Sequence, residues 1–166
     1  MDWQLAIVVA AVVFGLFVFY RFRPLLGGRA GGPVGVELKE ARARLAKAAN
    51  DTEKTEALAA CGDACAKQIG LGGAASSYYL RAMRLSPTSE ALVERAATGL
   101  ARRPRTLETL MWRRLGAEPW TSGSADATKA ALKQLIAVYT GKRRSALRAR
   151  MAERALEAME QWTAKS

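Results

Sequence analysis

Two cysteines, Cys61 and Cys65, are the residues of this chain with the clearest capacity for metal chemistry. They stand four positions apart, so on a helix they share a face where two thiolates could hold a soft cation. The 166-residue chain has no third cysteine and no histidine, which rules out a tetrahedral zinc site and imidazole-based catalysis. A disulfide between two such helical positions fits bond geometry poorly. We interpret both cysteines as small packing residues between helices.

A glycine-rich stretch, GLGG at residues 70–73, follows the cysteines. A phosphate-binding loop of the P-loop type would follow a strand, open a helix and precede a lysine, and this sequence does not meet that pattern. We interpret the stretch as a turn in which glycine lets one helix end and the chain reverse. Carboxylates and hydroxyls are present elsewhere, but their spacing defines no acid, base or nucleophile arrangement. The sequence therefore predicts no enzymatic activity and no cofactor or metal.

The elements that must carry these residues are helices throughout residues 34–166. Apolar residues recur at spacings of three and four, and no run of alternating β-branched residues occurs. Glycine, proline and capping residues mark the breaks between seven expected helices. The breaks fall at Asn50–Thr52, Gly70–Gly73, Ser86–Thr88, Arg103–Pro104, Pro119–Ser124 and Gly141.

An internal period in the low thirties is indicated by the 32-residue separation of Pro87 and Pro119. Residues 55–88 resemble one tetratricopeptide repeat, and residues 89–119 and 125–158 resemble it more weakly. The positions that carry the resemblance are Gly62, Ala75, Tyr79, Ala82 and Pro87. The resemblance implies a small α-solenoid of stacked helix hairpins, whose concave inner surface binds a protein segment.

The inward positions of this repeat differ from those of members that clamp a peptide carboxylate. Where such members carry Lys and Asn, this chain has Ala59 and Asp63. Lys67 and Glu56 also fall on the inward face in this register. The resemblance therefore implies peptide binding without the carboxylate clamp.

The N-terminal 23 residues predict a transmembrane signal-anchor helix, followed by a Gly/Pro linker at 24–33 and the helical domain at 34–166. Residues 3–20 carry no charge and would cover about 27 Å as a helix, close to the thickness of a bilayer. The alternative is a core helix of a soluble protein. The predicted membrane-interface residues are Trp3, Tyr20, Arg21 and Arg23.

The basic residues that follow this segment set the expected orientation. By the positive-inside rule, the N-terminus would lie outside and the C-terminal domain in the cytoplasm of a single-pass inner or cytoplasmic membrane protein. The full expected fold class is thus all-α: one N-terminal transmembrane helix, then a small TPR-like solenoid of about seven helices.

The net charge of +11 is concentrated in the C-terminal part of the chain. Residues 101–166 carry fourteen Lys or Arg against six Asp or Glu. Such a surface could bind anionic headgroups, an acidic protein segment or RNA, or could be only a solvated face. The candidate partner-binding residues are Lys67, Arg102, Arg103, Arg105, Arg113, Arg114, Trp120, Lys142, Arg143 and Arg144.

Three functions fit this sequence. The first is a membrane-anchored scaffold or adaptor that holds a protein partner at the cytoplasmic membrane face. The second is an accessory subunit of a larger integral membrane complex, whose basic domain caps the cytoplasmic side. The third is RNA or ribosome binding by the basic C-terminal half. The first two need a protein partner and membrane lipid, and the third predicts affinity that falls steeply with salt.

Overall fold

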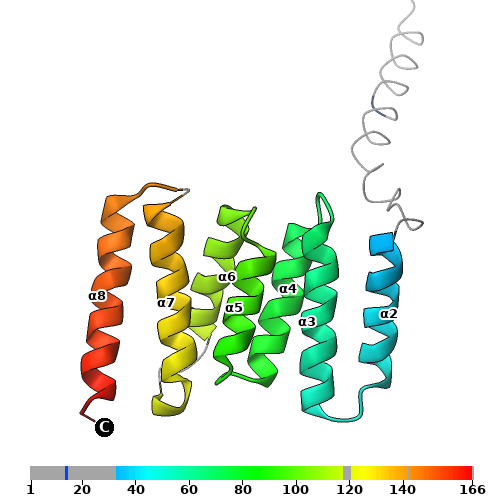
Figure 1. Cartoon of the computed structure of the whole chain (residues 1–166), viewed down its shortest axis with the longest axis horizontal. Coiled ribbons are helices and arrows are strands. Elements are labelled where there is room, and N and C mark those ends of the chain that lie inside the picture. Colours follow the sequence, from blue (N-terminus) through cyan, green and yellow to red (C-terminus); the bar gives the residue numbers. More distant parts are fainter. Residues whose placement is uncertain (1–13, 15–32, 118–120, 142, 166) are drawn as a thin grey trace, which may run out of the picture. The chain divides into compact units, whose positions relative to one another are not determined.

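The computed structural model describes residue 14 and residues 33–117, 121–141 and 143–165 (Figure 1). The chain divides into two units, Met1–Val36 and Glu37–Ser166. The described helices are α2 (Pro33–Lys47), α3 (Asp51–Lys67), α4 (Gly72–Leu85), α5 (Glu90–Gly99), α6 (Pro104–Ala117), α7 (Ala125–Thr140) and α8 (Ala146–Thr163), with a short 3₁₀ turn, η1, at Ser122–Ser124.

The prediction of an all-α chain is confirmed, with seven α-helices in the described residues. The expected fold class also included an N-terminal transmembrane helix, and this part is corrected. In the portion of the chain that the structure describes, every helix is too short or too polar to cross a membrane. The segment on which that expectation was based, residues 3–20, lies outside the described residues apart from Phe14.

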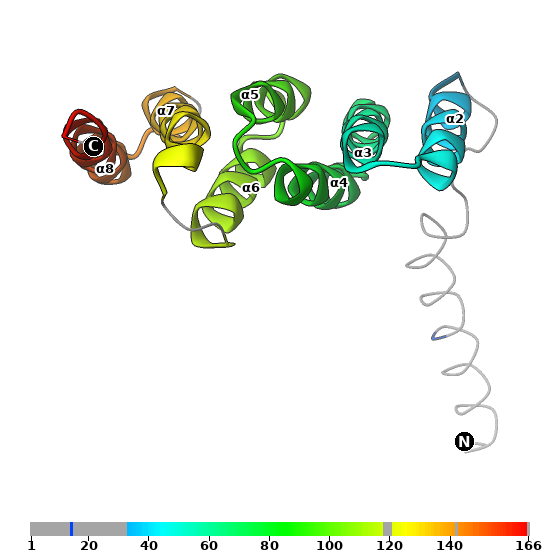
Figure 2. The same ribbon diagram turned by 90° about the horizontal axis from the view of Figure 1, so that it is seen from below.

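The helices of the second unit form two layers (Figure 2). In one layer α3 packs against α5 and α5 against α7, and in the other α4 packs against α6. Helix α3 also packs against α4, and α7 against α8, so these helices form two antiparallel pairs. The apolar stripes of α3 to α8 are buried in a single continuous core, and Leu38 and Leu45 of α2 pack against it while partly exposed.

Local sequence explains where the helices begin. The Asn50 side chain caps α3 by accepting a hydrogen bond from the backbone amide of Glu53 at 2.8 Å. The Glu53 carboxylate accepts in return from the amide of Ala49 at 2.9 Å, which makes a reciprocal cap. Ser89 caps α5 by accepting from the amide of Leu92. Gly70, with a φ of +90°, supplies the left-handed residue in the turn between α3 and α4.

Tyr79 on α4 occupies the centre of the core and is wholly buried. A Cβ atom placed on Gly62 of α3 would lie 2.8 Å from the ring of Tyr79, and one on Gly99 of α5 would overlap its hydroxyl. Both helices can approach the ring only because these two positions lack a side chain. The small residue at position 62 therefore lets α3 and α4 pack closely around an aromatic ring.

Cys61 and Cys65 lie in the same core, and both are fully buried as free thiols. Burial raises the pKa of each thiol, and the neighbouring Cys65 raises that of Cys61 further. The thiolate that metal binding or nucleophilic attack would need is therefore disfavoured. In the described part of the chain, moreover, no cluster of three or more Cys, Asp or Glu side chains is placed to hold a metal ion.

Candidate functional site

A network of charged side chains joins α3, α4 and α5 on the outer face of the first layer. Asp63 accepts a hydrogen bond from the Tyr79 hydroxyl at 2.5 Å and another from Nε of Arg95 at 2.8 Å. Arg95 also donates from Nη1 to both carboxylate oxygens of Glu56, at 2.8 and 2.9 Å. Each carboxylate oxygen of Asp63 thus accepts a hydrogen bond, and Asp63 positions Arg95 across the junction between α3 and α5.

The environment of this network shifts two pKa values. Burial and the hydrogen bond to Asp63 raise the pKa of Tyr79, so its hydroxyl stays a donor at every physiological pH. Burial by itself would lower the pKa of Arg95, but its bonds to Asp63 and Glu56 outweigh that effect and raise it. Neither the Tyr79 hydroxyl nor the Arg95 guanidinium therefore exchanges a proton near neutral pH. The network is suited to holding helices and ligands in place, and it offers no general acid or base.

An open cleft of about 620 Å³ lies beside this network, between α3 and α5. A smaller cleft of about 220 Å³ lies between α2 and α3, and the two clefts share Asp63 and Lys67 as lining residues. The combined surface carries both cations and anions. The larger cleft is lined by Asp63, Ala66, Lys67, Arg95, Thr98, Gly99, Ala101 and Arg102, and the smaller adds Glu37, Glu40 and Arg44.

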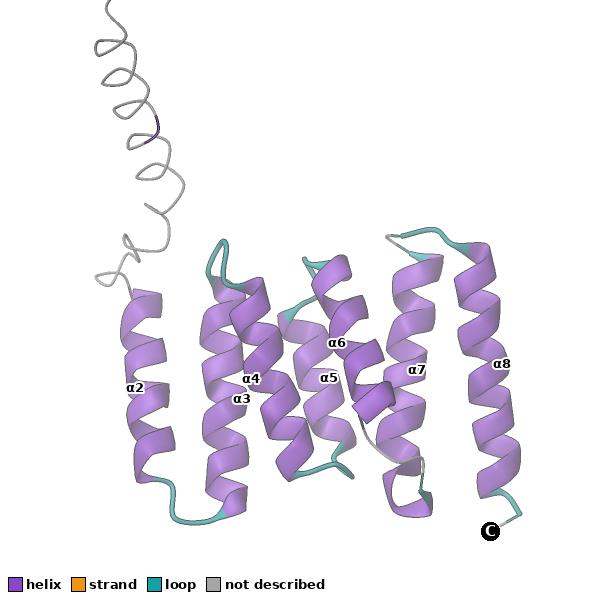
Figure 3. Cartoon of the chain, turned by 180° about the vertical axis from the view of Figure 1, so that it is seen from behind, coloured by secondary structure: helices purple, strands orange, loops and turns teal. Residues whose placement is uncertain are grey.

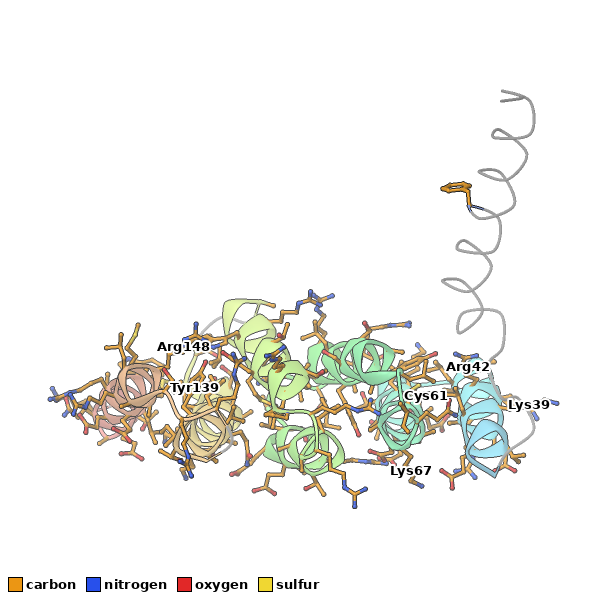
Figure 4. The ribbon with its side chains drawn as sticks, turned by 90° about the horizontal axis from the view of Figure 1, so that it is seen from above. Lys39, Arg42, Cys61, Lys67, Tyr139 and Arg148 are labelled. Carbon is orange, nitrogen blue, oxygen red and sulfur yellow. The ribbon has the colours of Figure 1, made fainter. Side chains whose placement is uncertain are left out.

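Lys67 and Arg102 are the two sequence-predicted candidates that the structure places in the larger cleft. Nζ of Lys67 forms an ion pair with Glu37 of α2 at 2.7 Å, and both side chains remain about half exposed. In Figure 4, Lys67 lies on the opposite side of the unit from Arg42 and Arg148. Arg102 is exposed at the end of α5.

Two predicted candidates support the fold instead of facing solvent. Arg114 is 1 % exposed and donates from Nη2 to the carbonyl of Pro87 at 2.5 Å, so it ties α6 to the turn after α4. Arg103 donates to the carbonyl of Gln68 in the turn between α3 and α4. Both guanidinium groups satisfy turn carbonyls that helix ends leave without a helical partner.

The remaining basic candidates are distributed over different faces. Arg105 and Arg113 line a third cleft, between α4 and α6. Arg143 is ion-paired with Glu108, and Arg144 is exposed, with a positive φ of 29°. The predicted basic residues therefore do not share one surface. Trp120 and Lys142, and the membrane-interface candidates Trp3, Tyr20, Arg21 and Arg23, lie outside the described residues.

A second buried network, which the sequence analysis did not identify, is centred on Glu108 of α6. Its side chain is 9 % exposed and binds Arg143, Arg148 at 2.7 Å and the Tyr139 hydroxyl at 2.9 Å. Trp112 donates from Nε1 to the same hydroxyl at 2.8 Å, and Arg148 lies over the Tyr139 ring. Burial raises the pKa of Tyr139, the bond from Trp112 lowers it and the bond to Glu108 raises it. This network joins α6, α7 and α8.

The residues missed by sequence analysis, Arg95 and Glu108, have partners 31 to 40 positions away. One available signal is that Glu108 is the single acidic residue of α6, set within its apolar stripe beside Leu107. An acidic residue at an apolar position indicates a buried partner. No comparable signal marks Arg95.

No family model, no curated protein and no solved structure matches this chain. The α3/α5 cleft is open, lined by both signs of charge, and built on side chains already held by long-range ion pairs. Those properties suit recognition of an extended polar segment.

Proposed function

We propose that this chain is a non-enzymatic scaffold of TPR-like helix hairpins that binds a protein partner through the cleft between α3 and α5. The single observation that carries the proposal is the position of this cleft. It opens between α3 and α5, which lie next to each other in one layer of the unit, and stacked helix arrays use such a layer for recognition. The resemblance of residues 55–88 to a tetratricopeptide repeat supports the same function.

The charges of the cleft specify the kind of segment that would fit. Lys67 and Arg102 present cations at the larger cleft. The smaller cleft carries both signs of charge, from Glu37 and Glu40 and from Arg44 and Lys67. Asp63 is the acidic residue of the larger cleft, and Tyr79 and Arg95 already donate to it, so it attracts a ligand cation less than a free carboxylate would. The partner segment we propose therefore places acidic side chains toward Arg102 at the α5 side of the larger cleft, and side chains of both charges toward α2.

Site-specific photo-crosslinking tests this function. A benzophenone side chain replaces Thr98, which lines the cleft, in one variant and exposed Met151 on α8 in another. We expect a discrete crosslinked partner with the first variant, captured at a stoichiometry well above that of the second. Equal capture by both positions would contradict a partner site in the α3/α5 cleft.

Charge reversal then tests the recognition with the purified partner. Arg102→Glu removes a cleft cation, and Arg150→Glu makes the same charge change at an exposed position on α8. We expect Arg102→Glu to weaken binding by about 10-fold or more, whereas Arg150→Glu changes it about 2-fold or less through the general field. Similar losses in both variants would indicate a diffuse electrostatic attraction without a defined site.

The other functions suggested by the sequence remain predictions. Binding of RNA by the basic C-terminal half would require the arginines to act together, but they occupy separate clefts or internal ion pairs. Steep salt dependence of RNA affinity would be its signature.

A further inference from the structure

The cleft between α4 and α6 has a composition unlike that of the α3/α5 cleft. It measures about 290 Å³ and lies in the other helix layer. Apart from one glycine, every residue that lines it is either cationic or carries a hydroxyl group. The lining residues are Gly73, Ser76, Arg105, Thr106, Thr109 and Arg113.

Two helix N-termini meet at this cleft. Helices α4 and α6 lie side by side and begin at the same end of the unit (Figure 3). Gly73 is in the first turn of α4, and Arg105 and Thr106 are in the first turn of α6. The amides of a first helical turn have no carbonyl partner within the helix, and they carry the positive end of its dipole. Leu71, the N-cap of α4, provides no side-chain cap.

Ser76 is an independent sign that this cleft receives a ligand. Its side chain lines the cleft although the residue is only 6 % exposed. Among the described residues, no acceptor or donor pairs with its hydroxyl, whereas the neighbouring Ser77 bonds the carbonyl of Gly73 at 3.0 Å. The hydroxyl oxygen is not fully enclosed, so it is a donor at the wall of a cationic cleft that an anionic ligand can reach.

The charge around the cleft is uncompensated. Neither Arg105 nor Arg113 forms an ion pair with the described residues, and both side chains are exposed. Helix α4 contains no acidic residue, and Glu108, the single one in α6, is turned into its own network with Arg143 and Arg148. Beneath the start of α4, Nη1 of Arg103 is buried close to Gly72 and has no hydrogen-bond partner in the described residues.

We propose that the α4/α6 cleft is a binding site for a dianionic phosphate group, carried as a phosphomonoester or as the free ion. The cleft is lined by residues of both first turns, by Ser76 and by Arg105 and Arg113, so amide, hydroxyl and guanidinium donors are available to one such group. A phosphomonoester dianion has three terminal oxygens to accept these donors, whereas a phosphodiester has two and a single charge. This cleft lies in a different helix layer from the proposed protein-binding cleft, so its test is independent of that function.

Calorimetric titration of the full chain at constant ionic strength tests the site. The probes are inorganic phosphate, the phosphomonoester N-acetyl-phosphoserine amide, and the phosphodiester dimethyl phosphate. We expect saturable binding of at least one of the first two probes, about 10-fold or more tighter than binding of the diester. Binding of phosphoserine assigns the source to a modified protein, and binding of phosphate alone assigns it to the free ion. Equal affinity for the diester would overturn the proposal.

Matched variants distinguish a site from a general positive field. Replacing Arg105 and Arg113 by Gln should weaken phosphate binding by about 10-fold or more. Replacing Arg81 and Arg84 by Gln removes the same charge from exposed positions of α4, and should change it by about 2-fold or less. Equal losses in the two double variants would show that only the net charge matters, and would contradict the site.

Gly73→Asp provides a sharper test because it separates binding from stability. A Cβ at Gly73 meets no atom within 4 Å, and an aspartate in the first turn of a helix favours the helix dipole. We therefore expect an unchanged or higher melting temperature together with complete loss of phosphate binding, since the carboxylate occupies the cleft. Retained phosphate binding in this folded variant would overturn the proposal. So would an RNA oligonucleotide that binds tightly and is unaffected by the substitution, since it would assign the arginines to an extended polyanion.

Discussion

Tyr79 shows how a few positions in this chain control packing across three helices. Its ring meets Gly62 of α3, its hydroxyl lies against Gly99 of α5, and that hydroxyl donates to Asp63. A larger residue at either glycine would have to displace the ring from a fully buried site. The tolerance of these two positions should therefore be much lower than that of other glycines in the helices.

We predict that Gly62→Ala lowers the free energy of unfolding by about 1–3 kcal/mol, because the added methyl overlaps the Tyr79 ring. The control is Gly116→Ala, near the end of α6, where a Cβ meets nothing within 4 Å. There the helix propensity of alanine should leave stability unchanged or raise it by up to about 1 kcal/mol. Urea denaturation of both variants measures the difference, and equal effects would contradict the role assigned to Gly62.

The buried thiols predict the response to alkaline pH. Burial raises the pKa of Cys61 and Cys65 above their ordinary value of 9.0, so the unfolded chain loses these protons at lower pH than the folded one. Stability from the neutral thiols is complete below about pH 9 and falls as pH rises toward the folded-state pKa. Tyr79 adds a similar loss above its ordinary value of 10.0.

We therefore predict that the free energy of unfolding decreases from about pH 9 upward, and that the decrease between pH 9 and 10 is shallower in the variant Cys61→Ala with Cys65→Ala. Urea denaturation between pH 7 and 10.5 measures both slopes. The comparison uses the slope, because loss of two buried sulfur atoms also lowers stability at every pH. An identical slope in both proteins would show that the thiols do not titrate differently on folding.

At the scale of single helices, the order and ends of the elements were predictable because they depend on local chemistry. Asn50, Gly70, Pro87 and Pro104 act through their own backbone and its nearest neighbours. The candidate sites were less predictable, since they depend on which faces the helices turn toward one another. Arg114 illustrates this, because a position that looked like part of an exposed basic pair is buried against the carbonyl of Pro87.

The N-caps of α3 and α8 can be compared to test how much a capping hydrogen bond stabilises a helix. We predict that Asn50→Ala costs about 1 kcal/mol, because its side chain satisfies the amide of Glu53 and orients the reciprocal bond to Ala49. Ser145 is the N-cap of α8, but its side chain makes no capping hydrogen bond. Ser145→Ala should therefore have less than half that effect. Thermal denaturation of both variants measures the contrast, and a larger loss at Ser145 would contradict it.

In the unit as a whole, each helix is stabilised mainly by the helices that pack directly against it. Helix α8 packs against α7 and buries only Ala149, Ala152 and Met159, whereas α7 is packed by α5, α6 and α8 and buries nine residues. In such arrays, local stability decreases toward the ends. The unit should therefore open from its C-terminal end without losing the central helices.

We predict that backbone amides of α8 exchange with deuterium about 10-fold or more faster than those of α3 and α7 under native conditions. Hydrogen exchange followed by mass spectrometry of peptides from each helix measures this gradient. Glu108→Gln should accelerate exchange in α8 more than in α3, because Glu108 binds Arg148 of α8. Uniform protection along the row would contradict opening from the end.

The ion pairs of Arg95 also affect how easily α3 and α5 move relative to each other. Arg95 connects Glu56 and Asp63 of α3 to α5, and it also lines the α3/α5 cleft. Under the proposed function, a segment bound in this cleft would touch the side chain that joins α3 to α5. A segment that leaves the Arg95 ion pairs intact would stiffen the contact between these two helices. One whose acidic side chain draws Arg95 away from Asp63 would loosen that contact, so the chemistry of the segment would set the elasticity of the unit.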